Sequence, residues 1–180
     1  MAVPSFVPAL VCAIVLAVGS FPAQTLPEKG EKPLRIPSSG GEVVIATAAE
    51  KAGAYDQFHF APARRVGDML YISGVVAGRR EGEGKDAAAF KAQVRRAFQR
   101  IQATLEAAGA SFDDVAMLNT FHVWQTPNFE GDKRAQFEAF SAVKDEFMKP
   151  PYPAWTAVGA TALIPDNGIV EIQAVVHLKK

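Results

Sequence analysis

The residue most suggestive of chemistry is a single glutamate, Glu171, in an alternating stretch near the C-terminus. Val170 and Ile172 flank it, and apolar side chains continue at every second position as far as Leu178. Such alternation predicts a β-strand with two different faces. A carboxylate in this setting needs a partner, water or a chemical role, because an unpaired buried charge is costly. Glu171 is therefore a candidate general base for water, and an ion pair at a subunit interface is the alternative.

A second candidate is the Ser73-Gly74 pair, which ends another strand-like run. A glycine at a strand end lets a ligand or another chain approach the backbone closely. Ser73 is interpreted as mainly structural, with hydrogen bonding to a ligand as the alternative, since no Ser-His-Asp order supports a nucleophile. His59, His122 and His177 lie on separate predicted strands without metal-ligand spacing, so we expect no metal site.

Periodicity predicts the elements that position these residues. Apolar residues recur at spacings of three and four from Phe90 to Ala108 and again between residues 132 and 148, which predicts two amphipathic helices. Asp86 is a suitable N-cap for the first helix, and Gly109 is suited to end it. Strand-like runs occupy residues 43–46, 57–65, 69–73, 115–124, 154–158 and 170–178, with turns at 66–68 and 165–168.

This order of elements favours the α+β class. We expect a mixed sheet of about six strands with both helices on one face. Two helices cannot cover both faces, and the second face also carries apolar residues. We therefore expect the second face to be buried by oligomerisation.

Composition limits the class of protein. With 180 residues, 49% of them hydrophobic and 21% charged, the chain is typical of one globular domain with an appendage. The formal net charge is zero and no basic cluster stands out, which argues against nucleic acid as the main partner.

The N-terminal segment resembles a targeting sequence. An apolar run at residues 7–18 is short for a membrane span and is followed by small residues, which predicts a signal peptide over residues 1–23 and an exported, periplasmic or secreted protein without stable membrane association after cleavage. An uncleaved anchor is the alternative. The single cysteine, Cys12, lies in this run, so cleavage leaves no thiol for catalysis, metal binding or disulfides. Residues 24–41 are rich in Pro, Gly, Ser and charge and are predicted to be a flexible linker to a domain at 42–180.

Several motifs in this order resemble the RidA/YjgF family, also called endoribonuclease L-PSP-like. The matching pieces are Arg65-Val-Gly-Asp-Met-Leu-Tyr-Ile-Ser-Gly, Leu105-Glu-Ala-Ala-Gly-Ala-Ser-Phe-Asp-Asp-Val, Phe137-Glu-Ala-Phe, Pro153-Ala-Trp-Thr-Ala-Val and Ile169-Val-Glu-Ile-Gln. The resemblance covers roughly residues 43–180. It implies a chorismate-mutase-like α+β fold and a homotrimer with small-molecule clefts between adjacent subunits.

The resemblance also implies a reaction, the cofactor-free hydrolysis of reactive imines and enamines to ketones and ammonia. In this family an arginine clamps the substrate carboxylate, a glutamate on the last strand positions or activates water, and a Ser-Gly pair helps to hold the substrate. Glu171 matches the glutamate, and Ser73 with Gly74 matches the pair. The arginine position is Trp155 and the small or cysteine position is Ala157, so this chain departs from the pattern at the substrate clamp.

Three further residues are candidates for contact with a ligand. Trp155 is interpreted as packing at the cleft wall, with stacking on a flat ligand as the alternative. Arg134 occupies a position where many family members have asparagine, and either it or Arg64 is a possible replacement for the missing charge. A solvated helix residue is the simpler interpretation of Arg134. His59, between Phe58 and Phe60, lies where the family often has a cleft aromatic.

Two function classes remain open. One is a divergent imine or enamine deaminase in which Glu171 handles water, and the other is a non-catalytic trimer that binds a small uncharged or aromatic metabolite. Ribonuclease activity is disfavoured by the neutral charge and by the absence of a histidine pair. Because Trp155 cannot clamp a carboxylate as an arginine does, we expect slow or no turnover of imines derived from amino acids.

Overall fold

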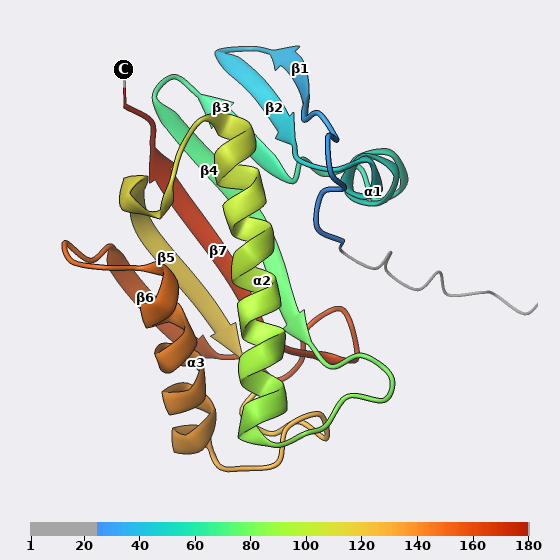
Figure 1. Ribbon diagram of the computed structural model, residues 1–180, viewed down its shortest axis with the longest axis vertical. Helices are drawn as coiled ribbons and strands as arrows, with labels where there is room; N and C mark the ends of the chain where they lie inside the picture. Colours follow the sequence, from blue (N-terminus) through green and yellow to red (C-terminus); the bar gives the residue numbers. More distant parts are fainter. Residues whose placement is uncertain (1–24, 180) are drawn as a thin grey trace, which may run out of the picture.

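The computed structural model describes residues 25–179 as a seven-stranded mixed sheet covered on one face by two long helices (Figure 1). The strands are β1 (Leu34–Ser38), β2 (Gly41–Ile45), β3 (Ala63–Val66), β4 (Met69–Gly78), β5 (Val115–His122), β6 (Ala154–Gly159) and β7 (Gly168–His177). The helical segments are α1 (Ala48–Glu50), continuing as η1 (Lys51–Gln57), then α2 (Ala87–Ala108), η2 (Phe112–Asp114) and α3 (Lys133–Phe147).

The strand order across the sheet is β1-β2-β3-β4-β7-β5-β6. Neighbouring strands are antiparallel except β5 and β6, which are parallel and are connected through α3. The long strands β4 and β7 therefore lie at the centre, and β6 forms one edge. This confirms the expected α+β class, with both long helices on the same face of a mixed sheet (Figure 1).

The additional strand comes from the segment that was predicted to be a flexible linker, residues 24–41. Leu34–Ser38 instead pairs with Gly41–Ile45 as an antiparallel hairpin. Arg35 holds the hairpin in place, because its guanidinium donates to Glu42 and to the carbonyl of Ala107 at the end of α2. The sheet therefore has seven strands rather than six.

Local signals set the ends of α2 as expected. The Asp86 side chain accepts a hydrogen bond from the Ala89 amide at 2.8 Å, which satisfies one of the unpaired N–H groups of the first turn. Gly109 ends the helix with φ of 76°, a left-handed conformation that favours glycine. Asp132 caps α3 in the same way by accepting from Ala135.

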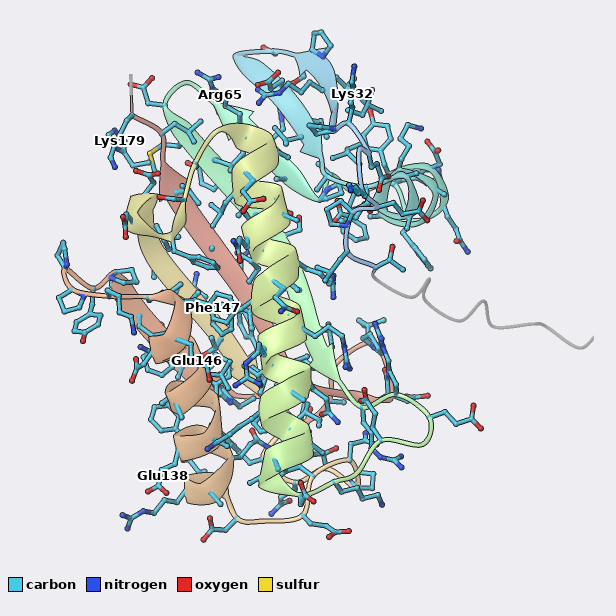
Figure 2. The ribbon with its side chains drawn as sticks, in the orientation of Figure 1. Lys32, Arg65, Glu138, Glu146, Phe147 and Lys179 are labelled. Atoms are coloured by element: carbon cyan, nitrogen blue, oxygen red, sulfur yellow. The ribbon has the colours of Figure 1, made fainter. Side chains whose placement is uncertain are left out.

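The core lies between the sheet and the two long helices. Side chains with no exposed surface meet there from both layers, including Phe98 on α2, Phe140 on α3, Leu70 on β4 and Ile172 on β7. The rings of Phe98 and Phe140 lie 5.9 Å apart. Figure 2 shows the exposed side chains of Glu138 and Glu146 on α3. The sheet face away from the helices carries exposed apolar side chains, such as Tyr71.

None of the helices within residues 25–179 is long and apolar enough to cross a membrane. The predicted signal peptide, residues 1–23, lies outside the described residues.

Candidate functional site

Glu171 lies on the sheet face that the helices leave open. Its neighbours Val170 and Ile172 have no exposed surface and point into the helix-covered core, so the alternation of β7 directs the Glu171 side chain to the opposite face. Val76 on β4 and Phe121 on β5 are its pairing partners in the sheet. The candidate base is therefore held by three central strands.

The structure places the Glu171 carboxyl group beside Gly74. The pairing of β4 with β7 shifts between Ile72 and Val75, so Ser73 and Gly74 form a bulge. The Glu171 carboxyl group fills the space beside the Gly74 α-carbon, and a β-carbon at Gly74 would overlap Glu171 Oε1 and lie 2.8 Å from its Cγ. The glycine thus makes room for the carboxylate, a use of a bulge that is common near active sites.

Glu171 is half-buried in its own chain, and the alternative of an ion pair across a subunit interface stays a prediction. Burial raises the pKa of the Glu171 carboxyl above its usual value. Within the part of the chain that the structure describes, the carboxylate makes no hydrogen bond or ion pair. A partly buried, unpartnered carboxylate with a raised pKa has the properties of a general base that accepts a proton from water.

Ser73 has a structural bond in this chain. Its Oγ donates to the carbonyl of Ala61 at 2.7 Å, and its amide donates to the carbonyl of Pro62 at 2.9 Å. These bonds attach the bulge to the segment that enters β3. This geometry agrees with the interpretation of Ser73 as mainly structural. The lone pairs of Oγ remain available to a ligand.

His59 lies in that same entering segment, two residues before Ala61. Its backbone has φ of 57°, a left-handed conformation that is uncommon for residues other than glycine. The side chain is exposed, as is the neighbouring Phe60. His59 is therefore near the bulge along the chain, but no contact joins it to Glu171.

Trp155 points to the other face of the sheet from Glu171. On β6 it pairs with Leu118, a core residue, and its indole stacks on Phe137 of α3 with ring centroids 5.3 Å apart and planes 5° from parallel. Trp155 packs against the hydrophobic core, and its place at a cleft wall stays a prediction. Ala157 follows two positions further along the same strand. Within one chain, Trp155 and Glu171 do not share a pocket.

A buried series of hydrogen bonds holds the Trp155 indole in place. These bonds were not predicted from the sequence. Trp155 Nε1 donates to Thr120 Oγ1 at 3.0 Å, and the Thr120 hydroxyl lies 3.0 Å from His122 Nε2. His122 Nδ1 lies 3.3 Å from Gln136 Oε1, and Gln136 Nε2 donates to the Val123 carbonyl. Because Gln136 Nε2 donates to the Val123 carbonyl, Gln136 Oε1 faces His122 and can only accept. His122 therefore carries its proton on Nδ1 and accepts at Nε2.

Neither Arg134 nor Arg64, the two candidates to replace the positive charge of the family's arginine, lies beside Trp155. Arg134 pairs with Glu138 one turn along α3 at 2.8 Å, and its side chain is 87% exposed, as expected for a solvated helix residue. Arg64 binds the β1–β2 turn through Ser38 and the carbonyl of Ser39. The cation beside Trp155 is Lys144, whose Nζ lies 5.1 Å from the indole centroid.

Sequence signals exist for Lys144 and for the Thr120–His122 hydrogen bonds, neither of which was predicted. Phe137, Phe140 and Lys144 are spaced three and then four residues apart, so Lys144 is a lysine in the apolar stripe of α3. Thr120 and His122 alternate with Leu118 at core-facing positions of β5, so they are polar residues on the buried side. A polar residue at an apolar position indicates a partner inside the fold.

Comparison with known families and structures supports the fold. The endoribonuclease L-PSP family model matches residues 51–178. The RutC family protein YjgH of Escherichia coli is 42% identical over 125 residues, which cover 67% of this chain and 88% of YjgH. A 2-iminobutanoate/2-iminopropanoate deaminase of Dermatophagoides farinae is 31% identical over 138 residues, covering 76% of this chain and 96% of its own length.

Solved structures have the same arrangement of elements. The YjgH structure superposes with a TM-score of 0.55 at 38% identity, over 70% of this chain and 88% of its own. RidA from an Antarctic Psychrobacter species superposes with a TM-score of 0.53 at 33% identity, over 66% of this chain and 88% of its own. From the family match and these relatives, the chain belongs to the endoribonuclease L-PSP family, the RidA/YjgF family.

Proposed function

We propose that this protein hydrolyses small reactive imines or enamines to the corresponding carbonyl compounds, with Glu171 as the general base. The observation that carries the proposal is the unpartnered Glu171 carboxylate, held against the Gly74 bulge and with a raised pKa. The relative from Dermatophagoides farinae, named as an imine deaminase, supports the same reaction class.

The chemistry follows from one carboxylate and one water molecule. Glu171 accepts a proton from water as the oxygen attacks the carbon of the C=N bond, giving a tetrahedral carbinolamine. The protonated Glu171 gives this proton to the nitrogen, which completes the carbinolamine. Glu171 then accepts the hydroxyl proton of the carbinolamine and passes it to the nitrogen as the C–N bond breaks, so that ammonia leaves and the carbonyl group forms. The balance is imine plus water to ketone plus ammonia, with no cofactor. The raised pKa of Glu171 suits both proton transfers.

The substrate range follows from the charges around the site. No cation contacts Glu171 among the described residues, and Trp155 with its fixed indole N–H lies on the other face. We therefore propose that uncharged imines are better substrates than imines that carry a carboxylate. A site that lacks a guanidinium fork binds a carboxylate weakly.

Turnover is tested with imines generated in solution, by following ammonia release beyond the spontaneous rate. We expect Glu171→Gln to reduce the enzymatic rate by about 100-fold or more, the range for loss of a general base. Glu138→Gln is the matched control, because Glu138 is an exposed carboxylate on α3. It should keep full activity.

Two results would contradict this proposal. The first is no acceleration of ammonia release from any imine, charged or uncharged. The second is equal activity of Glu171→Gln and the parent protein. Fast turnover of amino-acid imines, abolished by Glu171→Gln, would refute only the proposed preference for uncharged substrates.

We also propose that the protein is an exported homotrimer. Export rests on the sequence of residues 1–23 alone. The trimer rests on the open sheet face, where Tyr71 on β4 and Val158 on β6 are 48% and 41% exposed. Exposed apolar side chains on a sheet face are a liability unless another chain covers them.

The alternative function is a trimer that binds a small molecule without turnover. The identity of residue 155 favours it, because a tryptophan stands where the resemblance places the family's substrate-clamping arginine. Saturable binding of a metabolite without ammonia release from any imine would support this alternative.

A further inference from the structure

A pocket of about 410 Å³ lies against α2, where the segment that precedes β1 passes the helix. Figure 1 shows this segment on the α1 side of α2. Three parts of the chain line the pocket: the segment with Thr25 and Leu26, the end of β4 with Arg80, and α2 with Ala92, Arg96 and Gln99. The volume is in the range that binds small molecules.

Arg80 brings an unused guanidinium to this pocket. The residue is exposed, and its side chain makes no hydrogen bond or ion pair with the described residues. Its backbone is held in place, because the Arg80 amide donates to the Glu83 carboxylate at 2.8 Å. A guanidinium carries five N–H donors, so Arg80 can donate two parallel hydrogen bonds to an anion without losing a bond inside the protein.

Arg96 brings a second guanidinium, and this one is already fixed. Its Nη1 donates to Glu83 Oε1 at 2.7 Å, and its Nη2 donates to the Gly78 carbonyl at 3.1 Å. Its Nε–H makes no bond to the described residues and remains a donor. A side chain that is ordered before binding reduces the entropic cost of holding a ligand.

Arg100 is a buried arginine one turn beyond Arg96 on α2. It is only 6% exposed, and its Nε is removed from water without a hydrogen-bond partner among the described residues. Burial lowers the pKa of Arg100 to about 9; the Glu50 carboxylate opposes this effect, and the charges of Arg80 and Arg96 add to it. The three guanidinium groups are therefore close enough to repel one another.

The charges of this group do not balance. Three arginines, Arg80, Arg96 and Arg100, face two carboxylates, Glu83 and Glu50, so one positive charge has no partner within the group. A buried cation without a hydrogen bond and next to like charges is costly. An anion in the pocket would offset this repulsion, so the arrangement favours an anionic ligand.

We propose that this pocket binds the phosphate group of a small phosphomonoester. Arg80 and Arg96 reach the pocket from different elements, and a tetrahedral phosphate has oxygens in several directions, so it can accept from both. The Gln99 amide and the Thr25 hydroxyl are further donors in the lining, and Leu26 is an apolar contact for the ester group. The proposal does not depend on the proposed imine hydrolysis.

The test is calorimetric titration with glycerol 3-phosphate at about 0.15 M salt, where exposed charges are largely screened. We expect saturable binding at one site per chain, with acetate and glycerol weaker by about tenfold or more. No saturable binding, or equal binding of acetate, would refute the proposal. Inorganic phosphate should bind about threefold more weakly, because it leaves Leu26 uncovered. Equal or tighter binding of inorganic phosphate would overturn the assignment to an ester.

Two arginine variants assign the binding to this pocket. Arg80→Gln removes an exposed guanidinium that makes no bond within the described chain, so it should leave the fold intact and weaken glycerol 3-phosphate by about tenfold or more. Arg134→Gln is the matched control, because it removes an exposed arginine on α3, and it should stay within about twofold of the parent protein. Unchanged affinity in Arg80→Gln, or an equal loss in Arg134→Gln, would contradict the site.

Two more variants test the geometry and the location. Arg96→Lys keeps the charge but loses the planar fork, so we expect glycerol 3-phosphate to bind about fivefold more weakly. Equal affinity in Arg96→Lys would count against a geometry made for phosphate. Glu171→Gln should bind glycerol 3-phosphate within about twofold of the parent protein, whether or not it retains turnover. Loss of binding in Glu171→Gln would show that the ester occupies the hydrolytic site instead of this pocket.

Discussion

At the scale of single residues, the site depends on the fit between Gly74 and Glu171. The absent side chain of Gly74 creates the space in which the carboxylate lies. Burial in that space raises the pKa of Glu171. The glycine thus sets both the position and the proton affinity of the candidate base.

Replacing this glycine should separate activity from stability. In Gly74→Ala the new methyl group overlaps the Glu171 carboxyl, so the flexible side chain must move away, at a cost of about 1 kcal/mol or less. We expect imine hydrolysis to fall as far as in Glu171→Gln, while the melting temperature falls by no more than about 2–4 °C. Gly84→Ala is the control, because it adds a methyl group in the loop before α2, 3.3 Å from the Ala89 β-carbon, and should keep its activity. Full activity in Gly74→Ala would contradict this account.

His122 should give stability a distinct pH dependence. Burial lowers its pKa to about 4, from an ordinary value of 6.5. Below about pH 6.5 the unfolded chain binds a proton that the native His122 does not bind, so stability falls as the pH falls toward 4. Urea unfolding should show a loss of about 2 kcal/mol between pH 7.5 and pH 5 from this group.

The comparison that isolates this effect is His122→Gln. The variant should be less stable overall, and its stability should fall less over the same pH range. Parallel pH profiles for the parent and the variant would show that His122 does not titrate differently in the folded and unfolded states.

At the scale of elements, the ends of α2 depend on local chemistry. The Asp86 cap satisfies the Ala89 amide, so Asp86→Ala should cost about 1 kcal/mol and lower the melting temperature by about 2–4 °C. Thermal unfolding followed by circular dichroism measures this change. Glu81→Ala, in the loop before α2, removes an exposed carboxylate and should leave the melting temperature unchanged. An equal shift in both variants would argue against capping.

Such local signals explain how much the sequence could predict. Asp86, Gly109 and the alternation around Glu171 act within a few residues, so they identify α2 and β7 and place the candidate base. β1 was not predictable because Leu34–Ser38 contains a proline and lies in a stretch rich in turn residues. Its strand conformation depends on pairing with β2 and on the reach of Arg35 to Ala107.

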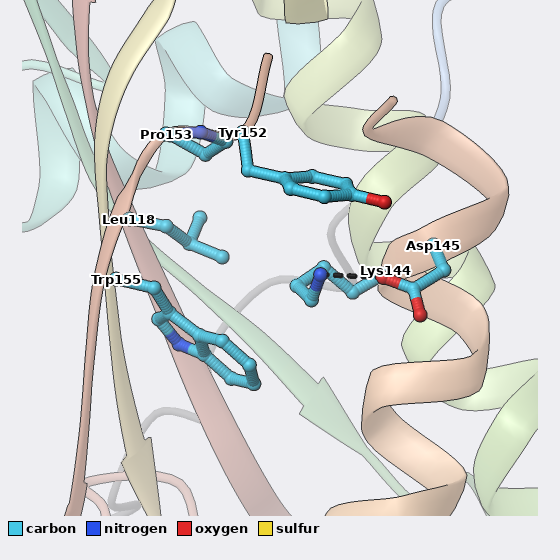
Figure 3. A pocket seen from close by; sticks show the side chains of 6 residues that line it. All are labelled: Leu118, Lys144, Asp145, Tyr152, Pro153 and Trp155. Atoms are coloured by element: carbon cyan, nitrogen blue, oxygen red, sulfur yellow. Dashed lines mark hydrogen bonds and ion pairs between the residues drawn. The ribbon is translucent and has the colours of Figure 1, made fainter. Parts of the chain in front are cut away.

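A pocket of about 380 Å³ lined by Lys144, Tyr152, Pro153 and Trp155 (Figure 3) escaped prediction for a similar reason. Its residues come from α3, from the connection and from β6, and their distances depend on how the helix packs on the sheet edge. Periodicity reveals only that Lys144 is out of place in an apolar stripe. It does not show that the Lys144 ammonium lies over the Trp155 ring.

At the scale of the whole molecule, the uncovered sheet face predicts the assembly. Light scattering on a chain covering residues 25–180 should give the mass of a trimer. Tyr71→Glu places a charge on the exposed apolar face and should shift the mass toward that of a monomer. Arg134→Glu changes an exposed residue of α3 and should leave the mass unchanged. A monomeric parent chain would refute the trimer.

The interlocking of Gly74 with Glu171 also limits the order in which this site can change during evolution. A side chain at position 74 displaces the carboxylate, so position 74 can change without loss of activity only once the acid is no longer used. After Glu171→Ala, the further change Gly74→Ala meets no carboxylate and should be nearly neutral. A descendant that has gained a side chain at position 74 has therefore given up the function of the acid, and recovery of that function requires the glycine as well as the glutamate.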